Sequence, residues 1–273
     1  MKISTERECT MVAPPVIFRI SGNAGFTLVE LSIVLVIIGL IIGGVLVGQD
    51  LIKVATIRAT ISQIEKYQTA VNTFRVKYNC IPGDCANATS FFGTNSTDGC
   101  PGTSTAASTG TCDGNGDGII NPWWVNGNIE STWANQQLSQ AGLIPGGLLG
   151  SSYAYSPTPG TNIPATPINP QIGEFLFTAP SGLAADFPPG FNDVIIQIGS
   201  LPVGGNDFLW GSGFTGDVSQ ALDMKLDDGL PNSGIVEANT QVAGVANPNT
   251  TCTNGTNYAT GANTGCIVYM KVK

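Results

Sequence analysis

The hydrophobic pattern of the chain changes at Asp50. From Phe26 to Gly48 the sequence is 23 residues of mostly Leu, Ile, Val and Gly, enough to cross a bilayer as a helix. After Asp50 the apolar residues recur at steps of three and four: Ile57, Ile61, Ile64, Tyr67, Val71, Phe74 and Tyr78. This spacing predicts an amphipathic helix with one face that packs on a globular body. No proline interrupts residues 26–79, so we expect one helix whose first half (26–49) is transmembrane and whose second half (50–79) is amphipathic.

The remainder of the chain, residues 80–273, has short strand-like runs separated by stretches rich in Gly, Ser, Thr, Asn and Pro. Strands are predicted at 174–179, 193–198, 207–210 and 266–273. Short helices are predicted at 132–144, capped at Gly142 or just beyond, and at 219–228, ended by Gly229 and Pro231. We therefore expect an α+β fold in which the long N-terminal helix packs on a small antiparallel sheet. The rest of this head domain should be loop-rich and disulfide-bonded.

Residues 1–25 are predicted to be a leader peptide that is removed. They carry Lys2, Arg7 and Arg19, and the small residue Gly25 comes before the apolar run. A secretory signal peptide has the opposite order, with a small-residue cleavage site after a shorter apolar core. Cleavage after Gly25 would remove the basic leader and leave the apolar helix on the mature protein. The basic residues should stay in the cytoplasm while the head is translocated. The sequence leaves open whether Met1 or Met11 is the start.

The formal charge of −8 is concentrated in the head domain. From Cys80 onward there are three basic residues against fourteen acidic ones. Nucleic-acid binding needs clustered Lys and Arg that release counterions from the phosphates. We therefore expect no direct nucleic-acid binding.

The chain has seven cysteines, of which Cys9 would leave with the leader. The six that remain are an even number, which indicates disulfides in an exported domain, although sequence alone permits many connectivities. We favour neighbours, each pair closing a short polar loop: Cys80–Cys85, Cys100–Cys112 and Cys252–Cys266. Zinc is the alternative, and the lack of histidine and of any CxxC pair argues against it.

Glu30 is the one acidic residue in the apolar run. A carboxylate is costly to place in hydrocarbon, so it either lies near the interface or has a partner. Cleavage after Gly25 would create such a partner, the amine of Phe26, about one helical turn away. In an assembly of parallel helices, Glu30 of one copy would neutralise the amine of its neighbour and so fix the axial register.

The segment "GFTLVELSIVLVIIG" resembles the N-terminal processing segment of type IV pilins and type II secretion pseudopilins. The resemblance covers about Gly25 to Cys80 and gives Gly25, Phe26 and Glu30 roles in processing and assembly. It implies cleavage and N-methylation by a prepilin peptidase, and assembly by a cytoplasmic ATPase complex with an inner-membrane platform protein. It also places Cys252–Cys266 at the disulfide-bounded C-terminal region of many pilins.

The segment "CDGNGDGIIN" (112–121) is a candidate calcium site. It has the spacing of the first half of an EF-hand loop, with oxygen ligands expected from Asp113, Asn115, Asp117 and the carbonyl of Ile119. Trp124 occupies the position of the bidentate glutamate, so Glu130 would have to complete the shell. The alternative is a solvated Asp/Asn/Gly turn. A second acidic turn at 226–234 is a weaker candidate.

These features together predict a structural subunit of a type IV pilus-like filament and not an enzyme. The chain has no histidine, no Gly-x-Ser-x-Gly elbow and no P-loop. Its partners would be copies of itself, other pilins and the assembly machinery, first in the inner membrane and then in a cell-surface filament. A type II secretion pseudopilin in a periplasmic pseudopilus is one alternative. A single-pass, membrane-anchored calcium-binding or adhesive protein is another.

Overall fold

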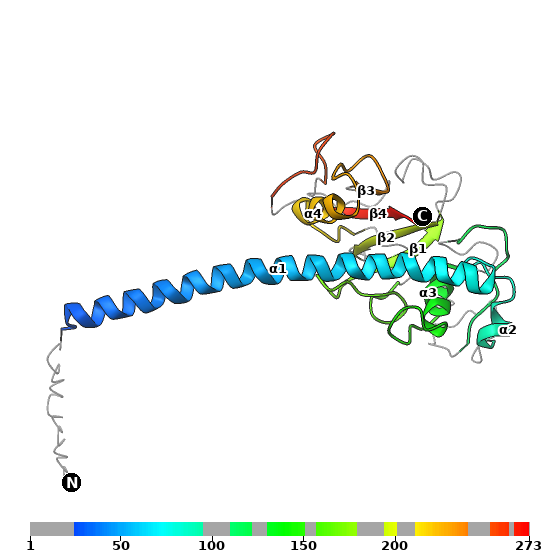
Figure 1. The fold of residues 1–273 in the computed structure, drawn as a ribbon, viewed down its shortest axis with the longest axis horizontal. Helices are drawn as coiled ribbons and strands as arrows, with labels where there is room; N and C mark the ends of the chain where they lie inside the picture. Colours follow the sequence, from blue (N-terminus) through cyan, green and yellow to red (C-terminus); the bar gives the residue numbers. More distant parts are fainter. Residues whose placement is uncertain are drawn as a thin grey trace, which may run out of the picture. The chain divides into compact units, whose positions relative to one another are not determined.

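The computed structural model describes residues 25–94, 110–121, 130–150, 157–178, 194–200, 211–239, 252–261 and 265–272 (Figure 1). The chain divides into two units, Met1–Gln49 and Asp50–Lys273. The predicted leader up to Ala24 lies outside the described residues, as do the predicted strand at 207–210 and Trp124.

Helix α1 runs without a break from Leu28 to Tyr78, which confirms the predicted long helix. In the first unit its apolar side chains are exposed, and by length and composition the helix is able to cross a membrane. In the second unit it buries the predicted apolar face, including Ile64, Tyr67, Val71 and Phe74. The helix ends where Asn79 adopts a left-handed backbone conformation, with φ of 56°.

The sheet has four antiparallel strands in the order β1-β2-β4-β3. The strands are β1 (Ile172–Thr178), β2 (Val194–Ser200), β3 (Val236–Asn239) and β4 (Ile267–Lys271). Three of them confirm the strands predicted at 174–179, 193–198 and 266–273. β3 was not predicted, because it is four residues long and directly follows a Gly- and Pro-rich turn. It completes the sheet by pairing with β4 from Val236↔Met270 to Asn239↔Ile267.

Three short helices complete the described structure of the head: α2 (Ala88–Phe92), α3 (Glu130–Gln140) and α4 (Gly216–Leu226). α3 and α4 correspond to the predicted helices at 132–144 and 219–228, and each begins a turn or less earlier. α3 is buried although most of its residues are polar. The buried side chain of Gln137 has hydrogen-bond partners within the protein: it accepts from the Gly83 amide at 2.7 Å and donates to the Cys112 carbonyl at 3.2 Å.

One hydrophobic core joins the buried face of α1 to one face of the sheet and to α3. α1 contributes Ile64, Val71 and Phe74, and the sheet contributes residues such as Leu176, Ile196, Val268 and Met270. The α+β architecture of a long N-terminal helix packed on a small antiparallel sheet is therefore as the sequence predicted.

Two of the predicted cysteine pairs are disulfides in the structure. Cys80–Cys85 closes the turn that follows α1, and Cys252–Cys266 ties the segment before β4 to the start of that strand. The third predicted pair, Cys100–Cys112, includes Cys100, which lies outside the described residues.

Candidate functional site

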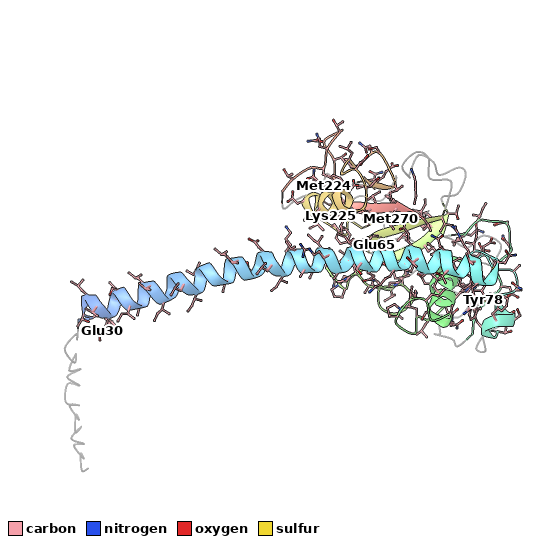
Figure 2. All side chains as sticks on the ribbon, viewed as in Figure 1. Glu30, Glu65, Tyr78, Met224, Lys225 and Met270 are labelled. Atoms are coloured by element: carbon pink, nitrogen blue, oxygen red, sulfur yellow. A yellow bond between two sulfur atoms is a disulfide. The ribbon has the colours of Figure 1, made fainter. Side chains whose placement is uncertain are left out.

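The residues just after the predicted cleavage point form a capping box at the start of α1, where Figure 2 labels Glu30. The Thr27 hydroxyl accepts from the Glu30 amide at 3.2 Å, and the Glu30 carboxylate accepts from the Thr27 amide at 2.8 Å. The Thr27 hydroxyl also donates to the same Oε2 atom at 2.8 Å. This reciprocal arrangement satisfies backbone donors that the first turn of a helix leaves unpaired.

The capping box gives Glu30 a local role that the sequence analysis did not assign. The signal was present in the sequence as Thr-x-x-Glu (Thr27 to Glu30) directly before an apolar run. It also explains why α1 begins at Leu28 and not at Phe26, since Thr27 is the cap. Phe26 lies outside the helix with 88% of its surface exposed.

The apolar side chains that follow the cap are exposed among the described residues. Eighteen residues with large apolar side chains between Leu28 and Val54 are each at least 46% exposed. A contiguous apolar surface of this size marks a membrane or protein contact. The helix that carries it is also able to cross a bilayer by its length and composition.

The predicted calcium loop at 112–121 is organised by Asp84, a residue that the sequence analysis did not single out. One carboxylate oxygen of Asp84 accepts from the Gly116 and Asp117 amides at 2.7 and 3.1 Å, and the other accepts from the Gly118 amide at 2.9 Å. Gly114 passes so close to Asp84 that a side-chain carbon there would lie 2.4 Å from its backbone. The turn therefore wraps around Asp84, a residue that is only 4% exposed.

Glu130, proposed from the sequence as a further calcium ligand, lies beside the same loop; its role as a ligand stays a prediction. From the start of α3 it accepts from the Asn115 amide at 3.0 Å and from the Asn121 amide at 2.9 Å. Asp117 bonds within the turn, accepting from the Ile119 amide at 2.8 Å and from the Asn115 side chain at 2.8 Å.

The Asp113 side chain contacts α2 and not the other predicted calcium ligands. Its carboxylate accepts from the Thr89 amide at 2.7 Å and from the Thr89 hydroxyl at 2.9 Å, in the first turn of α2. Calcium binding would require Asp113 to exchange these bonds for the ion. Burial raises the pKa of both Asp84 and Glu130, and the hydrogen bonds from the loop amides oppose this rise.

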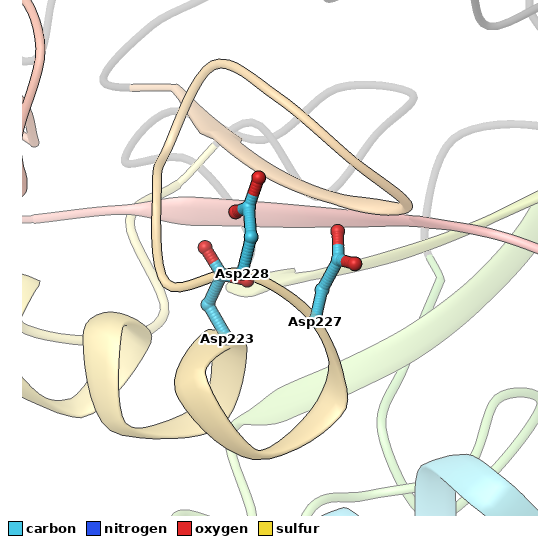
Figure 3. Close-up of side chains that lie close together, drawn as sticks. All are labelled: Asp223, Asp227 and Asp228. Atoms are coloured by element: carbon cyan, nitrogen blue, oxygen red, sulfur yellow. The ribbon is translucent and has the colours of Figure 1, made fainter.

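The second acidic turn holds a tighter carboxylate cluster (Figure 3). One oxygen each from Asp223, Asp227 and Asp228 lie within 4.8 Å of one another, at the C-terminal end of α4. Asp223 accepts from the Tyr258 hydroxyl at 2.8 Å, Asp227 from the Ile235 amide at 2.5 Å, and Asp228 from the Ser233 hydroxyl at 2.6 Å. These bonds fasten the turn before β3, so the cluster has a structural role.

The calcium hypothesis for the 112–121 loop stays a prediction, and thermal unfolding of the full chain tests it. If calcium binds, the midpoint in excess calcium should exceed that in chelator by about 5–10 °C at a hundred times the dissociation constant. Asp117→Asn should remove the shift, whereas Asp228→Asn, in the other acidic turn, should keep it. Equal midpoints with calcium and with chelator would contradict the hypothesis.

Comparison with known protein families gives a match near the start of the chain. Residues 20–46 match the model of the prokaryotic N-terminal methylation motif. The match spans Gly25, Phe26 and Glu30, and it identifies a prepilin-type segment as found in type IV pilins and pseudopilins. No curated protein and no solved structure matches the chain. The motif supports a pilin-like or pseudopilin protein, and together with the apolar N-terminal helix it fits a membrane anchor.

Proposed function

We propose that the chain is a structural subunit of a type IV pilus-like filament, cleaved between Gly25 and Phe26 and polymerised through the first half of α1. The observation that carries the proposal is the pairing of the methylation motif at residues 20–46 with a helix whose apolar side chains are exposed in the described structure. A lipid bilayer would cover that surface before assembly, and equivalent helices of neighbouring copies would cover it in the filament.

The assembly partners follow from this proposal. A prepilin peptidase would cut after Gly25, and an inner-membrane platform protein with its cytoplasmic ATPase complex would add the subunit to the filament. Other copies and other pilins would be the neighbours within it. The head, with its disulfides Cys80–Cys85 and Cys252–Cys266, would face an oxidising compartment or the cell exterior.

Glu30 would have two roles in this proposal. It caps α1 of its own chain through Oε2. In the filament it would also pair with the new Phe26 amine of an adjoining copy and set the register between helices. Both roles use the carboxylate, but only the second needs its charge, because a glutamine at this position of a capping box also accepts from the cap amide.

Two substitutions of Glu30 separate these roles. Glu30→Ala should abolish surface filaments while the chain still reaches the membrane, since neither the cap nor the charge remains. Glu30→Gln keeps a cap acceptor and removes the charge, so it should also lose filaments if register depends on the ion pair. The measurements are electron microscopy of sheared filaments and mass spectrometry of the membrane-extracted N-terminus, which should begin with a methylated Phe26.

Each outcome bears on a different part of the proposal. Normal filaments with Glu30→Gln would contradict the ion-pair register and leave the capping role. Normal filaments with Glu30→Ala would show that assembly needs neither the cap nor the charge of Glu30. A parent protein whose N-terminal peptide still contains residues of the leader would contradict the processing step, and the filament assignment with it.

A further inference from the structure

Glu174 is a carboxylate on the core face of the sheet. It lies on β1 between Ile172 and Leu176, which point to the same face and belong to the hydrophobic core. Its partner across the ladder is Ile198 of β2, another core residue. Glu174 is 0% exposed, although a glutamate is almost never fully buried unless it is paired.

The carboxylate has no such partner in the part of the chain that the structure describes. Neither of its oxygens accepts a hydrogen bond there. Of the nearby polar groups, the Tyr67 hydroxyl donates to Asn135. The Gln63 side chain donates to the Ala165 carbonyl at 2.8 Å and lies near enough to Glu174 to lower its pKa slightly against the effect of burial, without meeting hydrogen-bond geometry to either carboxylate oxygen. The described part of the head has one ion pair, between Lys271 and Glu237, and it does not involve Glu174.

Glu174 lines a cavity of about 370 Å³ within the head. The other walls come from the buried half of α1 and from two loops before β1. Apart from Glu174, Gln63, Tyr67 and the exposed Lys66, these walls are formed by small or apolar residues, among them Ala59, Ile144, Pro145, Leu148, Pro164 and Ala165. A cavity of this volume, mostly apolar with few polar groups, has the properties of a small-molecule site.

We infer that this cavity binds a small organic ammonium compound, whose cationic nitrogen donates to Glu174 and whose apolar body lies against the walls formed by Ile144, Leu148 and Pro164. An ammonium supplies both the charge and the hydrogen-bond donors that a buried carboxylate lacks. Anionic ligands would add a second negative charge. Calcium or magnesium would need about six oxygen ligands, which these walls do not provide.

Binding to this site should strengthen as the pH rises. Burial raises the pKa of Glu174 to about 8, so near neutral pH the group is mainly protonated and must lose its proton to pair with an ammonium. The other titratable groups that face the cavity, Lys66 and Tyr67, both lie on α1. The strand neighbours of Glu174 and the two loops contribute none. Deprotonation of Glu174 should therefore dominate the pH dependence between pH 6 and about 8.

Calorimetric titration of the full chain in detergent micelles tests the inference, with benzylamine as the probe and benzyl alcohol as its neutral counterpart. Benzylamine should bind the parent more tightly at pH 8 than at pH 6, and more tightly than benzyl alcohol does. Glu174→Gln should weaken benzylamine binding by roughly 10- to 100-fold. Glu65→Gln removes the same charge from an exposed position on α1 and should leave binding unchanged (Figure 2).

A second measurement does not depend on any variant. The titration of the Glu174 carboxyl carbon, followed by NMR in the parent protein, should move to lower pH when benzylamine is added. Equal benzylamine affinity in the parent and in Glu174→Gln would overturn the inference. So would a pKa of the Glu174 carboxyl that does not change when benzylamine is saturating. Benzylamine binding that appears only in Lys66→Gln would identify Lys66 as the resident cation and would also overturn it.

Discussion

Replacing Glu174 with glutamine is expected to stabilise the head at alkaline pH relative to the parent, and to lose that advantage in acid. The carboxyl has a usual pKa of 4.5, and burial raises it to about 8 in the folded protein. The folded state therefore holds a proton that the unfolded chain has already released. At about 1.4 kcal/mol per pKa unit, ionising Glu174 inside the core costs the parent about 5 kcal/mol.

The sign of the effect follows from the raised pKa. The stability contributed by protonated Glu174 is complete below pH 4.5 and is lost as the pH rises to about 8. Glutamine has about the same shape and does not titrate, so the difference between parent and variant isolates this one group. Burial also raises the pKa of Asp223, to about 6, but that group titrates equally in both chains and cancels.

Urea unfolding of the full chain in micelles at pH 4.5, 6, 7.5 and 9 provides the measurement, with near-ultraviolet circular dichroism as the signal. The unfolding free energy of Glu174→Gln minus that of the parent should increase from pH 4.5 to pH 9. Glu65→Gln is the matched control, because its side chain is exposed on α1. A difference between Glu174→Gln and the parent that stays constant with pH would mean that the carboxyl is solvated or paired.

The sequence predicted the elements whose signal is local and periodic. Seven apolar residues at steps of three and four defined the face of α1, and in the structure that face is buried or partly buried. The disulfides Cys80–Cys85 and Cys252–Cys266 followed from nearness along the chain. The Thr-x-x-Glu spacing from Thr27 to Glu30 also predicts the capping box, because it depends only on residues three apart.

The features that the sequence did not predict depend on contacts between distant segments. Asp84 organises the 112–121 loop through backbone amides about 30 residues away, and no spacing rule connects them. A strand was predicted at 174–179, and alternate residues of a strand such as Glu174 and Leu176 share a face, but the sequence does not say which face is buried. Only the packing of α1 against the sheet makes that glutamate a core residue, and therefore a candidate for binding.

Phe74→Ala should strongly lower the free energy of unfolding, because the side chain packs α1 against the rest of the head. It is 0% exposed, and its ring lies 4.5 Å from that of Tyr78 and 6.0 Å from that of Phe92, between ring centroids. Truncating a buried phenylalanine removes its apolar contacts and leaves a cavity, at a cost of about 3–5 kcal/mol. Val76→Ala, two residues along α1 at a position 87% exposed, should cost no more than about 0.5 kcal/mol. Urea unfolding of the parent and the two variants at one pH gives the loss of unfolding free energy for each. Equal losses for Phe74→Ala and Val76→Ala would contradict the prediction that the periodic apolar face of α1 packs against the head.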